Sequence, residues 1–451
     1  KEKINKMGAI KIVNGKLINE GCIEQKDILI FDDKIEKIGN SIKTSQNVKV
    51  FDASGKYIIP GLIDDQVHFR EPGLTHKATI ESESKAAIAG GVTSFLEMPN
   101  TIPQTTTIKD WEFKNMIASK TSYANYGFMF GGTNHNLKEI KALDEKKVPA
   151  LKLFLGSSTG NMLINNQEVL KEIFKSTNLV IAVHCEDEVI INKNLIEAKK
   201  KFGENIPMSY HPKIRSEEAC FVSSSNAIEL AKETGARLHV FHISTAKEIS
   251  LFQNDIPLKQ KKITSEVCTH HLWFNNEDYL EKGSKIKWNP AIKTKKDQEA
   301  LWNGLNQDYI DVLATDHAPH THNEKSAPYL TSPSGGPLLQ HSLSALLTCF
   351  HQKRITLEKI IEKACHNPSI LFEIKDRGFI REGFFADLVV IDLQKYFHVK
   401  KSNILYKCGW SPFENITFKG IVEKTFVNGH LAYDKGNISS KSAARALTFN
   451  R

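Results

Sequence analysis

The stretch Ile310-Asp311-Val312-Leu313-Ala314-Thr315-Asp316-His317-Ala318-Pro319-His320 joins an apolar, strand-like run to a group of polar residues. It puts a carboxylate and two imidazoles at the exit of a buried strand. These groups bind zinc or carry protons in hydrolytic sites. In the structural alternative, Asp316 caps the following turn and the histidines are solvated loop residues. Similar stretches lie upstream, so we favour a functional site.

Residues 63–70 form the first of these upstream stretches and have the pattern of a strand. Side chains on a strand alternate between its faces, so Gln66, His68 and Arg70 are expected to point the same way. One face would then offer an amide oxygen, an imidazole and a guanidinium to a single cavity.

Three further apolar runs carry one polar residue each. Lys152 lies in the middle of the run at 150–155, where a buried, unpaired ammonium is costly. We therefore expect Lys152 to be neutralised, paired or chemically modified. His184 and His242 close the runs that begin at residues 180 and 237. Either histidine alone would be read as structural, but their recurrence at strand ends indicates a shared site.

Together these motifs resemble those of the dihydroorotases of the amidohydrolase superfamily, over about residues 7–433. The motifs are His68-Phe69-Arg70-Glu71-Pro72-Gly73, Glu97-Met98-Pro99-Asn100-Thr101, Leu151-Lys152-Leu153-Phe154, Val183-His184-Cys185-Glu186-Asp187 and Asp316-His317-Ala318-Pro319-His320. One such match would be weak, but all of them in order are specific. The resemblance implies a zinc-dependent cyclic amidohydrolase that interconverts N-carbamoyl-L-aspartate and L-dihydroorotate in de novo pyrimidine biosynthesis.

The resemblance also implies a metal centre that holds one or two zinc ions. Its expected ligands are Gln66, His68, Lys152, His184, His242 and Asp316. Asp316 is also the expected catalytic acid and base. Lys152 matches a position that many relatives carboxylate on N6, and the alternative is an unmodified lysine paired with Asp316 or another carboxylate. Gln66 departs from the family, which has histidine there, so we expect one metal position to be weaker.

Substrate binding is expected to involve a second set of residues around the metal. These are Arg70, Asn100, Asn289, His320, Gly335 and Gly336. Arg70 offers a planar fork for a substrate carboxylate, which lysine could not match. The family sequence after Asn289 is altered here, with Lys293 where arginine is common.

The fold expected is α/β, a (β/α)8 TIM-like barrel with a small β-sandwich domain. Strand and helix patterns alternate from residue 60 to about 372, including helices at 216–234 and 357–364, which indicates a parallel barrel. Short β-rich runs precede this region and return after residue 378. The resemblance implies that both chain ends form the small domain, with boundaries 1–59, 60–377 and 378–451.

Composition narrows the class of protein further. The formal charge of +8 comes mainly from lysines spread along all 451 residues, unlike a nucleic-acid footprint. The 7 cysteines include no Cys-x-x-Cys pair, which favours reduced thiols and a cytoplasmic location. No apolar run has membrane-spanning length, and residues 1–6 have the character of an unstructured extension.

Two other functions remain open at this point. A sister cyclic amidohydrolase, such as an allantoinase or dihydropyrimidinase, would use the same metals on a substrate without the carboxylate. An impaired dihydroorotase-like chain would instead be a structural partner of a transcarbamoylase, and Gln66 points in that direction. We expect an enzyme with a small-molecule substrate, as a homodimer with possible association with a transcarbamoylase.

Overall fold

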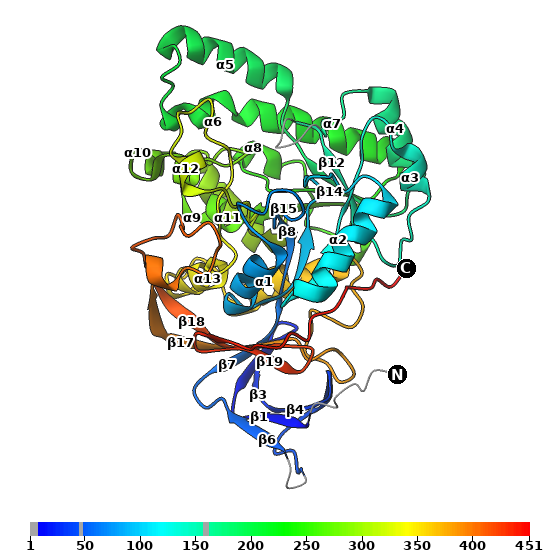
Figure 1. Cartoon of the computed structure of the whole chain (residues 1–451), viewed down its shortest axis with the longest axis vertical. Coiled ribbons are helices and arrows are strands. Elements are labelled where there is room, and N and C mark those ends of the chain that lie inside the picture. The colour runs from blue at the N-terminus through cyan, green and yellow to red at the C-terminus, as the bar shows by residue number, and fades with distance from the viewer. Residues whose placement is uncertain (1–7, 45–47, 157–161) are drawn as a thin grey trace.

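The computed structural model describes residues 8–44, 48–156 and 162–451 (Figure 1). The extension expected at residues 1–6 lies outside these ranges. All seven cysteines lie within them and are free thiols, as the sequence predicted.

Parallel strands form the centre of the larger unit. In chain order they are β8 (Leu62–Val67), β9 (Val92–Glu97), β10 (Asn125–Phe128), β11 (Phe130–Gly131), β12 (Ala150–Phe154), β13 (Val180–His184), β14 (Leu238–Val240), β15 (Ile263–Cys268) and β16 (Val312–Ala314). Each strand pairs with its neighbour in this order, except that Met129 separates β10 from β11. An isolated parallel bridge connects Val67, at the end of β8, with His317, three residues beyond β16, and His68 N–H donates to His317 C=O at 2.7 Å. The (β/α)8 barrel expected from the sequence is confirmed.

Helices surround this barrel (Figure 1). They are α1 (Ile80–Ala89), α2 (Ile108–Thr121), α3 (Leu137–Lys141), α4 (Gln167–Ser176), α5 (Glu188–Phe202), α6 (His211–Ile214), α7 (Glu217–Thr234), α8 (Ala246–Ile249), α9 (Thr269–Trp273), α10 (Tyr279–Lys282), α11 (Lys295–Asn306), α12 (His322–Lys325), α13 (Ser342–His351), α14 (Leu357–Ile361) and α15 (Asn367–Leu371). Helix α7 matches the predicted helix at 216–234: the Ser216 side chain caps its start, and Gly235 ends it with φ 74°. No helix in the described ranges is long and apolar enough to cross a membrane.

Both chain ends build the smaller unit, which lies below the barrel in Figure 1. One sheet has the order β20 (Asn437–Ile438), β19 (His430–Asp434), β18 (Thr417–Val427), β17 (Leu388–His398), β7 (Tyr57–Pro60), β2 (Lys16–Asn19) and β3 (Cys22–Gln25). The other has the order β5 (Lys34–Gly39), β4 (Asp27–Phe31), β1 (Ile10–Val13) and β6 (Lys49–Asp52). Buried Ile12, Ile30 and Leu388 belong to one apolar cluster shared by the two sheets. The β-sandwich predicted from both chain ends is confirmed.

The hairpin between β18 and β19 turns at Asn428-Gly429, a residue pair that favours a tight hairpin. These residues have φ values of 49° and 76°, the left-handed conformation that a tight hairpin requires. A Cβ atom at Gly429 would lie 2.2 Å from Asp32 O, so close packing also excludes a larger residue. Beyond the hairpin the chain returns to the barrel, where Arg451 Nη2 donates to the carbonyls of Pro149 and Phe372.

Several barrel strands are shorter than the sequence suggested. β8 ends at Val67, β14 at Val240 and β16 at Ala314. Arg70, His242 and Asp316 follow these strands with φ values of 66°, 37° and 46°, so they leave the β region of backbone space. The alternation rule therefore does not place Arg70, because it lies on the loop beyond β8. Such left-handed positions in non-glycine residues are concentrated at functional sites.

A buried ion pair supports the segment that follows β8. Lys114 on α2 pairs with Glu97 at the end of β9, and both side chains are almost wholly buried. Lys114 Nζ also donates to Met98 O at 2.9 Å. Glu97 Oε1 accepts the backbone N–H of Phe69 at 3.1 Å, which fixes the chain between His68 and Arg70.

We predict that Lys114→Met destabilises the fold by about 3–5 kcal/mol, because it leaves the Glu97 carboxylate buried without its partner. The midpoint of thermal unfolding should fall clearly. The double variant Glu97→Leu/Lys114→Met is the control and should recover part of the loss, since it removes both charges. A single variant as stable as the unmodified chain would contradict this account of the pair.

Candidate active site

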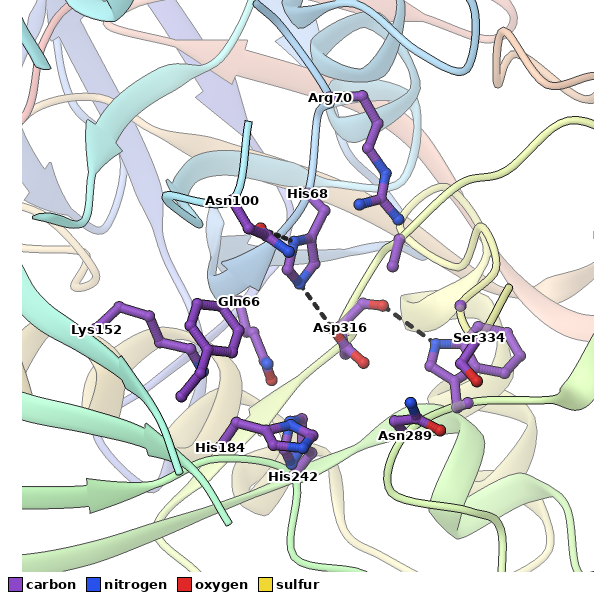
Figure 2. Close-up of a pocket in the computed structure, with 14 residues that line it drawn as sticks. Gln66, His68, Arg70, Asn100, Lys152, His184, His242, Asn289, Asp316 and Ser334 are labelled. Carbon is purple, nitrogen blue, oxygen red and sulfur yellow. Dashed lines mark hydrogen bonds and ion pairs between the residues drawn. The ribbon is translucent and has the colours of Figure 1, made fainter. Parts of the chain in front are cut away.

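A buried cavity of about 80 Å³ opens at the carboxyl ends of the barrel strands. It is lined by Gln66, His68, Arg70, Asn100, Lys152, Phe154, His184, His242, Trp288, Asn289, Asp316, Ala318, Ser334 and Gly335. Figure 2 shows the amide of Gln66, the imidazoles of His184 and His242 and the carboxylate of Asp316 around one space. Carboxyl ends of barrel strands are where barrel enzymes place their active sites.

One half of the cavity holds a pair of imidazoles with a fixed orientation. His184 Nδ1 lies 3.0 Å from His242 Nε2. On its other side, His184 Nε2 lies 3.0 Å from Glu186 Oε2 and donates its proton to that carboxylate. Burial alone would raise the pKa of Glu186, but Arg215 and His184 bring it down to about 2. His184 Nδ1 therefore points a lone pair toward His242.

The other half pairs an imidazole with a carboxylate. His68 Nε2 lies 3.2 Å from Asp316 Oδ1. Its Nδ1 lies 2.8 Å from Asn100 Oδ1, and an amide oxygen can only accept, so Nδ1 carries the proton. Burial raises the pKa of Asp316 to about 7, although nearby Lys152 acts in the opposite direction.

Both halves have the chemistry of metal ligands. In each, the outer imidazole nitrogen donates to an oxygen, which turns the inner lone pair toward the cavity, the usual arrangement behind a metal-bound histidine. The inner atoms then face another nitrogen or oxygen at 3.0–3.2 Å. Because nitrogen and carboxylate oxygen suit zinc, the His184–His242 pair and the His68–Asp316 pair each have the chemistry of zinc ligands on one side of the cavity.

Lys152 lies on β12, and two aromatic side chains lie close to its amine. Its Nζ lies 4.1 Å from the ring centre of Phe241 and 4.8 Å from that of Phe154. It makes no hydrogen bond or salt bridge to any residue that the structure describes. Burial lowers the pKa of Lys152 to about 7, so a large fraction of the amine is neutral at physiological pH. A neutral amine is the form that can be modified.

Gln66 lines the cavity as expected, with its amide oxygen directed toward a thiol. Cys268 Sγ on β15 lies 3.8 Å from Gln66 Oε1 and 3.3 Å from Glu266 Oε1. The pairing of β8 with β9 is irregular between Asp64 and Val67, which is where Gln66 lies.

Arg70 is held rigidly at the edge of the cavity. Its Nε donates to Pro319 O at 3.0 Å, and its Nη2 lies 3.1 Å from His320 Nε2. Burial lowers the pKa of Arg70 to about 10, so the guanidinium remains charged at neutral pH. Lys77, which the sequence reasoning did not consider, lies 3.0 Å from His320 Nδ1.

Of the other residues predicted to bind substrate, some line the cavity and others lie behind its wall. Asn289 and Gly335 line the cavity, and Asn289 Oδ1 has no hydrogen-bond partner among the described residues. Asn100 also lines it, but its amide oxygen is engaged by His68. His320 contacts Arg70 from behind the cavity wall. At Gly336, a Cβ atom would lie 2.5 Å from the Trp288 ring.

The sequence reasoning missed two buried groups that β15 and its neighbours form. Cys268, His270 and His271 have ligand atoms within 4.8 Å of one another, and so do Asp65, His239 and Glu266. The sequence Glu266-Val267-Cys268-Thr269-His270-His271 was the available signal, because it ends an apolar strand run.

Comparison with known proteins agrees with this fold and cavity. Residues 57–432 match the Amidohydrolase family, so the chain belongs to that family. It is 32% identical over 447 residues to the dihydroorotase of Methanosarcina acetivorans, covering 96% of this chain and 94% of the relative. It is 34% identical over 436 residues to that of Carboxydothermus hydrogenoformans, covering 94% and 98%. The predicted resemblance to dihydroorotases is confirmed.

Solved structures give the same fold with a different substrate class. The L-hydantoinase (dihydropyrimidinase) from Arthrobacter aurescens superposes with a TM-score of 0.93 at 26% identity, covering 98% of this chain and all of the other. The dihydropyrimidinase from Brevibacillus agri gives a TM-score of 0.88 at 23% identity, with 98% and 100% covered. The fold, cavity and relatives together define a cyclic amidohydrolase.

We predict that His184→Ala loses about one zinc ion per chain and all turnover, because it removes a ligand whose orientation Glu186 fixes. Metal content by mass spectrometry, with turnover of dihydroorotate, measures both effects. His398→Ala, which removes an exposed imidazole, is the matched control and should change neither. Unchanged zinc and activity in His184→Ala would rule out this ligand assignment.

Proposed function

We propose that the chain is a zinc-dependent dihydroorotase, which interconverts N-carbamoyl-L-aspartate and L-dihydroorotate in de novo pyrimidine biosynthesis. The observation that carries this proposal is the position of Arg70. Its charged guanidinium is fixed at the edge of the same cavity that Asp316 and the imidazoles line. Dihydroorotate carries a carboxylate next to a cyclic amide, so it needs these two features in one cavity.

Arg70 would bind the substrate carboxylate through its planar fork, and Asn289 would donate a further hydrogen bond from its amide. This orients the ring so that its amide carbon faces Asp316. The Pro319 carbonyl accepts a hydrogen bond from Arg70 Nε, and the His320 ring lies against the guanidinium. Asn100 acts through His68, whose Nδ1 proton it accepts. Backbone groups of Gly335 line the cavity, with Gly336 packed behind them.

Asp316 would transfer the proton in both directions. In hydrolysis it removes a proton from the attacking water as the new C–O bond forms, and gives a proton to the ring nitrogen as the C–N bond breaks. In ring closure it takes the proton from the attacking ureido nitrogen as the N–C bond forms, and gives it to the hydroxide that leaves as water when the carboxyl C–O bond breaks. His68, His184, His242 and Asp316 would hold zinc, which when bound would lower the pKa of a water molecule and polarise the amide carbonyl.

Lys152 is the proposed bridge between two metal positions. Its depressed pKa favours the neutral amine, which can add to carbon dioxide, form an N–C bond and release a proton. The N6-carboxylate so formed replaces a buried cation with a bidentate anionic ligand. The alternative, an unmodified ammonium paired with a carboxylate, has no such ion pair in the described structure to support it.

The two rival functions have weaker support. The hydantoinase and dihydropyrimidinase structures share the fold, but a substrate without a carboxylate gives Arg70 no role. The structural-partner function rests on Gln66 alone, whereas the imidazoles, Lys152 and Asp316 all reach the cavity. We also retain as proposals a homodimer, an association with a transcarbamoylase, a cytoplasmic location and the domain boundaries at residues 59 and 377.

Arg70→Lys tests the substrate. It keeps the charge but loses the planar fork, so kcat/KM for dihydroorotate should fall by the equivalent of about 1.5–3 kcal/mol, roughly 10- to 150-fold. This fall in kcat/KM should come mainly from a higher KM. Arg354→Lys, the same change at a surface pair with Glu299, should have no effect. An unchanged KM in Arg70→Lys, or faster turnover of dihydrouracil than of dihydroorotate by the unmodified chain, would favour the sister enzymes.

Gln66→His tests the weaker metal position. The imidazole replaces an amide that is uncharged and less basic, so zinc bound per chain should rise at limiting zinc. Activity need not rise, because the surrounding residues are arranged for glutamine. Unmodified protein with full two-metal occupancy, at zinc concentrations that also saturate Gln66→His, would show that Gln66 does not weaken the site. Protein without metal or turnover, even with zinc and bicarbonate, would support the structural-partner function.

A further inference from the structure

A second polar group lies inside the barrel, on the amino-terminal side of the cavity. Asp65, His239 and Glu266 come from β8, β14 and β15, and their side chains are fully buried. His239 Nε2 lies 3.4 Å from Asp65 Oδ2 and 3.7 Å from Glu266 Oε2. The proposed catalytic mechanism uses none of these residues.

The hydrogen bonds of His239 determine which nitrogen carries its proton. His239 Nδ1 lies 2.8 Å from Thr264 Oγ1, and that hydroxyl donates its own proton to Leu238 O at 3.2 Å. The hydroxyl can therefore only accept from His239, so Nδ1–H is the donor. The Nε2 atom then faces two carboxylates, and a proton or a cation between these atoms would relieve their repulsion.

The remaining polar atoms of the group have no hydrogen-bond partner in the described part of the chain. Both oxygens of Asp65, His239 Nε2 and Glu266 Oε2 have no hydrogen-bond partner among the described residues. Unpaired buried carboxylates are strongly unfavourable, so the group needs a proton on Nε2, a proton on Glu266, whose pKa burial and Asp65 raise, or a cation between its atoms. In the absence of a metal, Asp65 and Glu266 would outweigh burial and raise the pKa of His239 to about 9.

The distances from His239 Nε2 to the two carboxylates distinguish a shared proton from a bound metal ion. A charge-assisted hydrogen bond would bring nitrogen and oxygen to about 2.7–2.9 Å. Ligand atoms around a tetrahedral zinc, with bonds of about 2.0–2.2 Å, lie about 3.3–3.6 Å apart. The observed 3.4 and 3.7 Å correspond to the second arrangement. The Nδ1–H bond to Thr264 is also the usual support behind a metal-bound histidine.

We propose that Asp65, His239 and Glu266 form a buried site for a divalent cation of the zinc type, separate from the cavity ligands. One imidazole and two carboxylates neutralise such an ion and leave its fourth position to the second Asp65 oxygen or a water molecule. This proposal does not depend on the proposed function, because it concerns a different set of atoms.

The buried site is connected to the cavity through Glu266. Its Oε1 atom accepts the backbone N–H of His242 at 3.1 Å and the thiol of Cys268 at 3.3 Å. The same thiol contacts Gln66. A cation on Oε2 would therefore fix the carboxylate that positions His242, where the backbone leaves β14 with positive φ. The site would act as a structural support beneath the catalytic ligands.

Anomalous diffraction from crystals of the unmodified chain with zinc is the direct test. Data on either side of the zinc edge should show a peak between the Asp65, His239 and Glu266 side chains, whether or not the enzyme turns over dihydroorotate. No peak there, with the His239–carboxylate contacts shortened to hydrogen bonds, would overturn the proposal in favour of a protonated His239. A peak at Cys268, His270 and His271 instead would also overturn it.

Metal content in paired variants tests the same claim in solution. In a His184→Ala background, Asp65→Asn should lose about one further zinc ion per chain. Asp64→Asn is the matched control and should keep that ion, because Asp64 bonds to Thr315 and lies outside the group. Equal zinc content in the two double variants would overturn the proposal. Circular dichroism establishes that both are folded before metal is measured.

Discussion

Lone pairs of buried nitrogen and oxygen atoms face one another at the barrel strands, and this constraint governs the rest of the site. Asn100, Glu186 and Thr264 each occupy the outer nitrogen of one histidine. The inner nitrogens therefore point at carboxylates or other imidazoles among buried residues. Lone pairs held this close repel one another unless a proton or a cation lies between them.

The backbone is arranged to meet this constraint. Arg70, His242 and Asp316 adopt positive φ immediately beyond their strands, which turns their side chains into one space. Conformations of this kind cost energy and persist only when the surrounding structure holds them. The bonds from Glu97 to Phe69 and from Glu266 to His242 provide such support from the neighbouring strands.

Much of the fold and of the candidate site could be predicted from the sequence, and the features that were missed have physical causes. Alternating strand and helix patterns indicated the barrel, and the Asn428-Gly429 turn located a hairpin of the small domain. Lys152 was identified because a lysine inside a buried strand is costly without a partner, and His184 because histidines recur at the ends of strands. Asn100 lines the cavity, as expected of a residue assigned to the substrate, but the contact of its amide oxygen with His68 joins distant segments and was not predicted. The group at Asp65 was missed, because the sequence signal lies on β15 alone, whereas the group joins three strands and includes a residue in the irregular part of β8.

A crystal structure of the zinc-loaded chain with bound L-dihydroorotate would test the central claim most directly. The account predicts that the substrate carboxylate lies within hydrogen-bond distance of the Arg70 guanidinium, and that the ring amide lies against Asp316 and the His184–His242 pair. A ligand bound in the cavity with its carboxylate away from Arg70, or no ligand at saturating concentration, would contradict it.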